Sequence, residues 1–422
     1  KTTVIRALLE RLGADRCVVI CPTHKARRVV AAGLPDARTA TVAATLRLRP
    51  GINGDTGAIS FSRGNVNPDA SGFLQDGQPP SALILDEASM VISGHVHDLE
   101  VLAGKLGAAL LLVGDEAQLD PVSPSASGVR GLQTMAWQFV CNPRTARLET
   151  VMRTGIGPVL NLSRDVRHST DLRGIWPAES LYSDASQIVL HEWADNPDHA
   201  RVLTWTHREA LRVGELIRQN RFPGSQTEWH PGEWISAPSG IPCLANALGN
   251  PIAPACSEFK ILSVEPAEHL AKTTGAFTWH TPARHEERHV LLTATTNASV
   301  AVVQHDDQQI KLLLEPPDQI GSWSSQCKEL RRLVKTKFDG TAADRRALFK
   351  KIADLETWIP NLRSAVTQTI HSSQGSSYQQ VFVARDLRHA LIADPAGAQR
   401  LAYVAVSRAR GTLHLQPLNT PN

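Results

Sequence analysis

The sequence lacks the features that mark membrane, secreted and zinc-binding proteins. No apolar run approaches the roughly 18 residues that a helix needs to cross a bilayer, and the N-terminus shows no signal-peptide pattern. The six cysteines are scattered and include no Cys-x-x-Cys pair, so a structural zinc site is not indicated. We therefore expect a cytoplasmic protein with buried, reduced thiols and no membrane partner.

An excess of charge of one sign is also lacking. Lys and Arg number 44, and Asp and Glu number 41, which leaves a net charge of +3. This balance permits a polyanionic partner without demanding one, because a nucleic-acid groove needs local rather than total charge. With 42% hydrophobic and 20% charged residues, the 422-residue chain is long enough for about three globular domains.

Two short apolar runs within residues 81–122 each end in polar side chains. One run stops before Asp86 and Glu87, and the other stops before Gly114, with Gln118 a few residues further on. Unbroken runs of this kind are typical of strands buried on both faces of a parallel sheet, and ligands bind at the carboxyl ends of such strands. Adjacent carboxylates there suit a nucleotide-bound Mg²⁺ at Asp86 and a base that orients water at Glu87. The alternative is that the acidic pair merely ends a strand.

The first residues favour a nucleotide site. Lys1 and Thr2 precede a helical pattern of apolar residues that stops at Gly13. Lysine followed by threonine at a helix start is the end of a phosphate-binding loop, whose glycines would stand just before them. We therefore expect the sequence to begin within its own phosphate loop.

Further segments extend the first α/β pattern, which we place within residues 1–150. A buried strand at Cys17–Cys21 ends before Thr23, His24 and several cations, which suit either a phosphodiester backbone or a solvated helix start. The residues from Asp36 to Pro50 carry weak helical signals. Residues 51–80 are rich in Gly, Asn, Asp, Ser and Pro, which predicts an exposed excursion with a hairpin.

A second α/β unit is predicted at residues 151–231 and 317–422. Its strands are expected at 202–206, 380–384 and 412–415. Between its two parts, residues 232–316 alternate apolar and polar residues in short runs, which predicts an inserted small β-barrel. Two helices with basic faces are expected to meet at Gly340, the second opened by a capping box of Thr341 and Asp344. We favour solvated faces, and the alternative is a track for nucleic acid.

Taken in order, these segments resemble the motifs of superfamily 1 DNA helicases, in the RecD-like and Dda-like branch that moves 5′ to 3′. The resemblance spans the chain through residues 1–2, 21–26, 85–90, 113–122, 148–153, 202–210, 369–378 and 403–410. It implies an α/β fold of two RecA-like P-loop domains, each a parallel sheet flanked by helices, with a hairpin excursion in the first and a small β-barrel inserted in the second. The chain differs from the family pattern at Ser372 and Gln379, where lysine and aspartate are usual.

The resemblance also implies roles for single residues. Lys1 would contact the β- and γ-phosphates, Thr2 and Asp86 the Mg²⁺, and Glu87 the attacking water. The other nucleotide contacts would be Gln118, Arg153 and Arg408 at the γ-phosphate, with Gly375 in the ATP-binding set. Single-stranded DNA would be held by Thr23, His24, Thr206, Thr369 and His371. The excursion over residues 51–80 would be the strand-splitting pin.

The resulting hypothesis is an ATP-dependent DNA helicase that uses ATP and Mg²⁺ and binds single-stranded and duplex DNA. Two alternatives stay open. One is a catalytically impaired nucleic-acid binding fragment, which the changes at Ser372 and Gln379 would suit. The other is an RNA helicase of the same superfamily, which a comparison of ribose and deoxyribose strands would identify.

Overall fold

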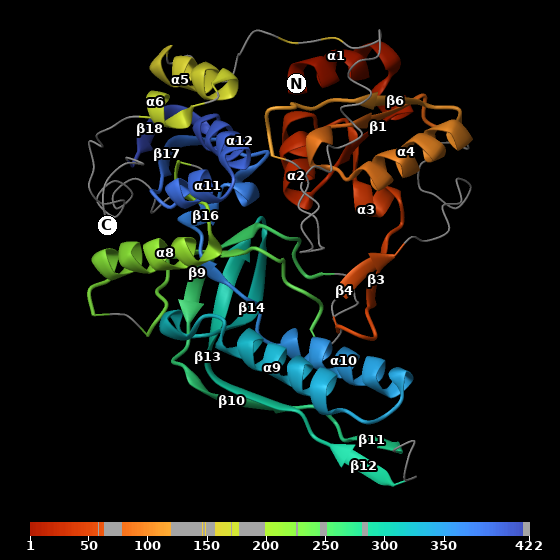
Figure 1. The fold of residues 1–422 in the computed structure, drawn as a ribbon, viewed down its shortest axis with the longest axis vertical. Coiled ribbons are helices and arrows are strands. Elements are labelled where there is room, and N and C mark those ends of the chain that lie inside the picture. The colour runs from red at the N-terminus through yellow and green to blue at the C-terminus, as the bar shows by residue number, and fades with distance from the viewer. Residues whose placement is uncertain are drawn as a thin grey trace.

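A computed structural model describes residues 1–57, 59–62, 78–119, 146, 148, 157–169, 171–176, 199–224, 227–244, 251–280 and 286–416. Within these residues the chain forms two parallel sheets flanked by helices, one inserted antiparallel sheet, which lies below both of them in Figure 1, and two separate two-stranded hairpins. The predicted α/β fold class is confirmed. No helix in this described part of the chain has the length and apolar character to cross a bilayer.

The first parallel sheet contains the two apolar runs that the sequence singled out. Its order is β2-β1-β5-β6, with β1 at Cys17–Cys21, β2 at Arg38–Thr41, β5 at Ala82–Leu85 and β6 at Ala109–Leu112. The flanking helices are α1 (Thr2–Leu12), α2 (His24–Gly33) and α4 (Ser93–Leu106). Ile20 and Leu112 both lie level with Leu85, so the polar residues after β1, β5 and β6 follow at one edge of the sheet.

The two central strands of this sheet, β1 and β5, are buried on both faces. Alternate residues of β1 point in opposite directions, so Val19 packs with Ile5 of α1, while Ile20 packs with Leu99 of α4. All residues of β1 and β5 are buried, as their unbroken apolar runs predicted. The same prediction was wrong for the second run, because β6 lies at the edge of the sheet and its residues are exposed or half-buried.

The weak helical signals in residues 36–50 predicted a helix, and this prediction was wrong for the first part of the segment. Residues Arg38–Thr41 form β2, and only one helical turn follows, α3 at Val42–Thr45. Strand β2 lies at the edge of the sheet, where β1 is its one neighbour among the described strands, and it is mostly half-buried. An edge strand needs no apolar run, which explains why the sequence pattern did not show it.

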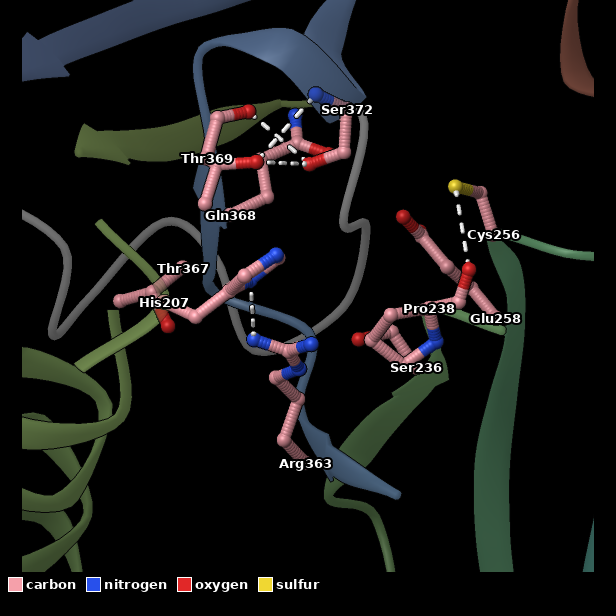
Figure 2. Close-up of a pocket in the computed structure, with 10 residues that line it drawn as sticks. All are labelled: His207, Ser236, Pro238, Cys256, Glu258, Arg363, Thr367, Gln368, Thr369 and Ser372. Atoms are coloured by element: carbon pink, nitrogen blue, oxygen red, sulfur yellow. Dashed lines mark hydrogen bonds between the residues drawn. The ribbon is translucent and has the colours of Figure 1, made fainter. Parts of the chain in front are cut away.

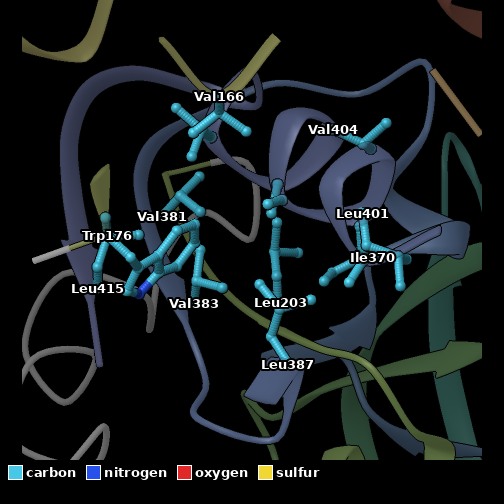
Figure 3. Close-up of a cluster of buried hydrophobic side chains, with 14 of the residues drawn as sticks. Val166, Trp176, Leu203, Ile370, Val381, Val383, Leu387, Leu401, Val404 and Leu415 are labelled. Atoms are coloured by element: carbon cyan, nitrogen blue, oxygen red, sulfur yellow. The ribbon is translucent and has the colours of Figure 1, made fainter. Parts of the chain in front are cut away.

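The second parallel sheet has the order β16-β7-β17-β18. Its strands are β7 (Ala200–Thr204), β16 (Thr367–Thr369), β17 (Tyr378–Val383) and β18 (Ala409–Leu415). One face of this sheet is covered by four helices, α5 (Gly157–His168), α6 (Leu172–Ile175), α11 (Leu387–Ala393) and α12 (Pro395–Val406). The other face is covered by α8 (His207–Arg221). Figure 3 shows the core on the first face, where Leu203 and Val383 of the sheet pack with Val166 and Leu401 of the helices.

The insertion predicted as a small β-barrel is a six-stranded antiparallel sheet in the order β10-β13-β9-β8-β15, with β14 paired to β13. Its strands are β8 (Trp234–Ala237), β9 (Ser257–Val264), β10 (Glu268–Thr273), β13 (Thr293–His305), β14 (Gln308–Leu314) and β15 (Arg363–Ser364). A separate hairpin pairs β11 (Phe277–His280) with β12 (Glu287–Val290). Helices α9 (Ser322–Lys337) and α10 (Ala342–Glu356) pack on this unit, and the predicted capping box at Thr341 and Asp344 is present.

The hairpin expected within residues 51–80 is also present. Strands β3 (Arg49–Ile52) and β4 (Ile59–Ser62) pair antiparallel, and residues 63–77 lie outside the described part. The connection between the strands packs on α10, because a Cβ at Gly57 would lie 2.7 Å from the Phe349 ring. Gly57 also has a φ of 69°, a conformation that favours glycine.

Candidate nucleotide and nucleic-acid sites

The acidic pair after β5 meets the N-terminal lysine at the carboxyl edge of the first sheet. Asp86 and Glu87 are each 7% exposed, and Lys1 Nζ lies 2.5 Å from a carboxylate oxygen of Glu87. Glu87 has a φ of 50°, and its N–H donates to Asp86 Oδ1 at 2.9 Å. The structure therefore brings together Lys1, before α1, and the acidic pair after β5.

Asp86 is a carboxylate that a cation would stabilise. Burial and the charge of Glu87 raise the pKa of Asp86 to about 6, although Lys1 lowers it in part. In the described part of the chain no group of three or more His, Cys, Asp or Glu residues forms a metal cluster, so phosphate oxygens would have to complete the coordination of a Mg²⁺ at this carboxylate.

Gln118 supplies a further sign of a polar ligand at this edge. It follows β6, is 6% exposed, and its Oε1 has no hydrogen-bond partner among the described residues. Leaving a buried acceptor unsatisfied costs about 1–3 kcal/mol, so a water or a ligand donor is expected to occupy this position. The residues at the edge thus fit a nucleotide carrying Mg²⁺.

Cys21, at the end of β1, has no catalytic character. Burial and the charges of Asp86 and Glu87 raise the pKa of the Cys21 thiol to about 12. The thiolate is the reactive form of cysteine, and it is absent at neutral pH here.

We expect Asp86→Asn to stabilise the nucleotide-free protein at pH 7.5 by about 2–3 kcal/mol while abolishing hydrolysis. Because the pKa of Asp86 is raised to about 6 from 3.8, the native state holds an extra proton between these values and loses stability as the pH rises through them. The gain from asparagine should therefore be full above pH 6 and shrink towards pH 4. Thermal unfolding across this pH range measures it, with Asp36→Asn at an exposed position as the control. An equal gain at pH 4 and pH 7.5 would contradict this account of Asp86.

The loop after β6 is tied to the second domain. Asp115 accepts hydrogen bonds from Arg167 Nη1 at 2.7 Å and from the Tyr403 hydroxyl at 2.8 Å. Burial alone would raise the pKa of Asp115, but Arg167 and Tyr403 outweigh it and the pKa is lowered. Helices α5 and α12 thus hold the loop that leads to Gln118.

A second contact between the domains lies beside the residues predicted to hold single-stranded DNA. We call Thr23 and His24 of the first domain the first grip, and Thr206, Thr369 and His371 of the second domain the second grip. Thr23 and His24 are exposed at the start of α2, where the Thr23 hydroxyl caps the helix by accepting from Ala26 N at 3.1 Å. Their neighbour Lys25 donates to the Ser372 carbonyl at 3.2 Å and approaches Gln368 Oε1 at 3.3 Å. Lys25 thus connects the start of α2 to the turn that follows Thr369.

The residues predicted for the second grip lie at neighbouring strand ends. Thr206 caps α8, and its hydroxyl donates to Asp386. The Thr369 hydroxyl is 3.0 Å from that of Ser372, and Thr369 itself is 4% exposed. Burial lowers the pKa of His371, and its neighbour His207 lowers it further, so both imidazoles are neutral at pH 7.

Two further residues predicted at the nucleotide, Arg408 and Gly375, lie within the described part of the chain. Arg408 is 1% exposed and donates to the carbonyls of Ser376 and Val404, each at 3.0 Å. Gly375, with a φ of 79°, lies against α2, since a Cβ there would be 3.7 Å from Ala26. Arg153 lies outside the described residues. Their roles at the nucleotide, like that of Thr2 at the first position of α1, stay predictions.

The sequence did not indicate the roles of Arg167 or Arg363. Neither residue lies in one of the motifs that the sequence singled out. The role of each arginine follows from its contacts in the folded chain. Arg167 contacts Asp115 and Tyr403, and Arg363 contacts His207.

Comparison with known proteins gives a family match for the first part of the chain. The model of the AAA domain family matches residues 1–188, which supports an ATPase-type domain there. No curated protein sequence matches the chain. Among solved structures, the chain is similar to the Pif1 helicase from Bacteroides in complex with ADP-AlF3 and ssDNA, at 13% identity and a TM-score of 0.44, covering 100% of this chain and 86% of that one. It is also similar to the Pif1 helicase from Candida albicans, at 13% identity and a TM-score of 0.43, covering 100% and 88%. Likeness at this identity concerns the fold alone.

Proposed function

We propose that the chain is an ATP-dependent DNA helicase of superfamily 1, in the RecD-like and Dda-like branch. It couples ATP hydrolysis to 5′ to 3′ movement on single-stranded DNA and separates duplex DNA ahead of it. The observation that carries this proposal is the meeting of Lys1, Asp86 and Glu87 at the carboxyl edge of a parallel sheet. The AAA domain match and the order of the sequence motifs support it.

At the nucleotide, each residue has one task. Lys1 leaves Glu87 to bind the β- and γ-phosphates, Thr2 and Asp86 hold the Mg²⁺, and Glu87 orients the water. The metal supplies charge neutralisation to the phosphates. Gln118 senses the γ-phosphate by donating from its side-chain amide N–H, and its buried Oε1, which has no partner among the described residues, accepts from a water. Arg153, Arg408 and Gly375 complete the set as predicted from the sequence.

On DNA, two grips alternate. Thr23 and His24 form the first, and Thr206, Thr369 and His371 form the second. The contact of Lys25 with Ser372 joins the grips, and the contact of Asp115 with Tyr403 joins the nucleotide loop to α12. Nucleotide-driven closure of the domains changes both contacts and so moves the grips relative to each other along the strand. The β3–β4 hairpin and the rest of residues 51–80 serve as the pin.

Steady-state ATP hydrolysis with and without single-stranded oligonucleotides tests the proposal. We expect strong stimulation by DNA, little by RNA of the same sequence, and none in the Asp86→Asn control, which removes the metal ligand. Strand displacement should require a 5′ rather than a 3′ single-stranded tail. DNA binding without hydrolysis would instead identify a nucleic-acid binding module, and equal stimulation by RNA would contradict the DNA preference.

A further inference from the structure

A small cavity lies between the second parallel sheet and the inserted sheet. Figure 2 shows its lining, with His207 and Arg363 on one side, Cys256 and Glu258 across from them, and Thr369 and Ser372 above. Its volume is about 20 Å³, which admits about one water-sized group. A base or a sugar ring is too large for it.

Arg363 brings an uncompensated charge to this cavity. The residue is 9% exposed, and its Nε has no hydrogen-bond partner within the described ranges. Its Nη1 lies 3.0 Å from His207 Nδ1, and because a guanidinium can only donate, Nδ1 accepts and the imidazole proton sits on Nε2. No carboxylate among the described residues forms an ion pair with Arg363.

The surrounding groups do not neutralise this guanidinium. Glu258 is the acidic side chain of the cavity wall, but it pairs with Arg201 at 3.1 Å and also faces the charge of Lys25. Burial raises the pKa of the Cys256 thiol, which is therefore neutral. Burial likewise lowers the pKa of Arg363. A buried cation without a partner is costly, so an anion that enters from solvent would stabilise this region.

The position of the cavity indicates which anion enters. Thr369 and Ser372 line it and belong to the turn that carries the second DNA grip, and His207, directly after Thr206, is exposed at its mouth. A short segment connects β15 in the inserted sheet, which ends at Ser364, to β16 in the parallel sheet, which begins at Thr367. A single strand of DNA held by the second grip would therefore run across the opening of the cavity, with its sugar-phosphate backbone towards it.

We propose that this cavity receives a phosphodiester oxygen of the bound single strand, with Arg363 as its cationic partner and His207 Nε2–H as a second donor. The proposal rests on the function proposed above and adds a contact from the inserted sheet to the second grip. Phosphate oxygens prefer such charge-assisted donors, and the contact carries no sequence information.

Binding of a labelled oligothymidylate without nucleotide, measured by fluorescence anisotropy over a range of salt, tests this subsite. Arg363→Gln should weaken binding about 10- to 100-fold, as expected for loss of a charge-assisted hydrogen bond. It should also flatten the slope of log K against log salt by about 0.7, the contribution of one phosphate. Arg363→Lys, which keeps the charge, should retain the slope. The control Arg6→Gln, an exposed arginine on α1, should change neither quantity.

Further measurements separate a phosphodiester subsite from a packing role and from a small-anion site. Oligonucleotides with one neutral methylphosphonate, moved along the strand, should reveal a sensitive position in the wild type that disappears in Arg363→Gln. The thermal stability of Arg363→Gln should equal or exceed that of the wild type, because a buried charge without a carboxylate partner is removed; a marked loss would assign Arg363 to packing and overturn the proposal. Stabilisation of the wild type by inorganic phosphate, with unchanged DNA affinity in Arg363→Gln, would mean a small-anion site and also overturn it. Failure of the wild type to bind DNA would instead remove the proposed function itself.

Discussion

Replacing Glu87 by glutamine is expected to lower the kcat for ATP hydrolysis by about 10²- to 10⁴-fold, the usual contribution of a positioned base. Glutamine keeps the size of the side chain and loses the ability to accept a proton from water. The same change breaks the ion pair that joins Glu87 to Lys1 at 2.5 Å. Glu87 then no longer competes with the phosphates for Lys1, so ATP affinity should be retained or increased.

Separate measurements of nucleotide binding and turnover check this expectation. Binding of a fluorescent ATP analogue reports affinity, and single-turnover hydrolysis reports the chemical step. Glu10→Gln, at an exposed position on α1, is the matched control and should leave both unchanged. Wild-type turnover in Glu87→Gln would remove Glu87 from the role of base and leave the ion pair with Lys1 as its function.

The sequence predicted the buried parts of the fold well because burial leaves a pattern. The strand at Cys17–Cys21 has the predicted bounds, and the helix before Gly13 ends at Leu12 as expected. The edge strand Arg38–Thr41 was missed, since a half-buried strand with one neighbour needs no apolar run. Helices α9 and α10 were predicted, but their packing on the inserted sheet depends on contacts that the sequence pattern does not show.

The candidate site also has residues whose position the sequence pattern predicted and residues whose contacts it did not. Asp86 and Glu87 were predictable because residues after parallel strands share one sheet edge. The link of Asp115 to Arg167 and Tyr403 was not, because it joins residues 52 and 288 positions apart in the chain. The same holds for Arg363, whose partner His207 is 156 positions away. Side chains that connect domains are set by tertiary packing, and their residue types alone do not mark them.

Arg408 is expected to contribute about 10³-fold or more to kcat, the range found for an arginine that stabilises the transferring phosphoryl group. In the structure the guanidinium of Arg408 is buried and bound to Ser376, Val404 and Ser407, each at 3.0 Å. Contact with the γ-phosphate would therefore require these hydrogen bonds to be exchanged when nucleotide binds, including the one to Ser376 in the loop after η6 (His371–Ser373). Coupling of this kind would keep hydrolysis slow until both domains engage.

Arg408→Lys tests the role most cleanly, because lysine keeps the charge but loses the planar set of donors. We expect kcat to fall close to that of Arg408→Ala, with nucleotide affinity changed little. Both variants also lose buried hydrogen bonds, at about 1–3 kcal/mol, so the assays belong below their unfolding temperatures. Arg410→Ala is the control, since Arg410 is exposed and donates to Ser377 Oγ at 3.0 Å. If turnover fell in Arg410→Ala and stayed normal in Arg408→Lys, Arg410 would be the phosphate contact and Arg408 a residue that stabilises the loop.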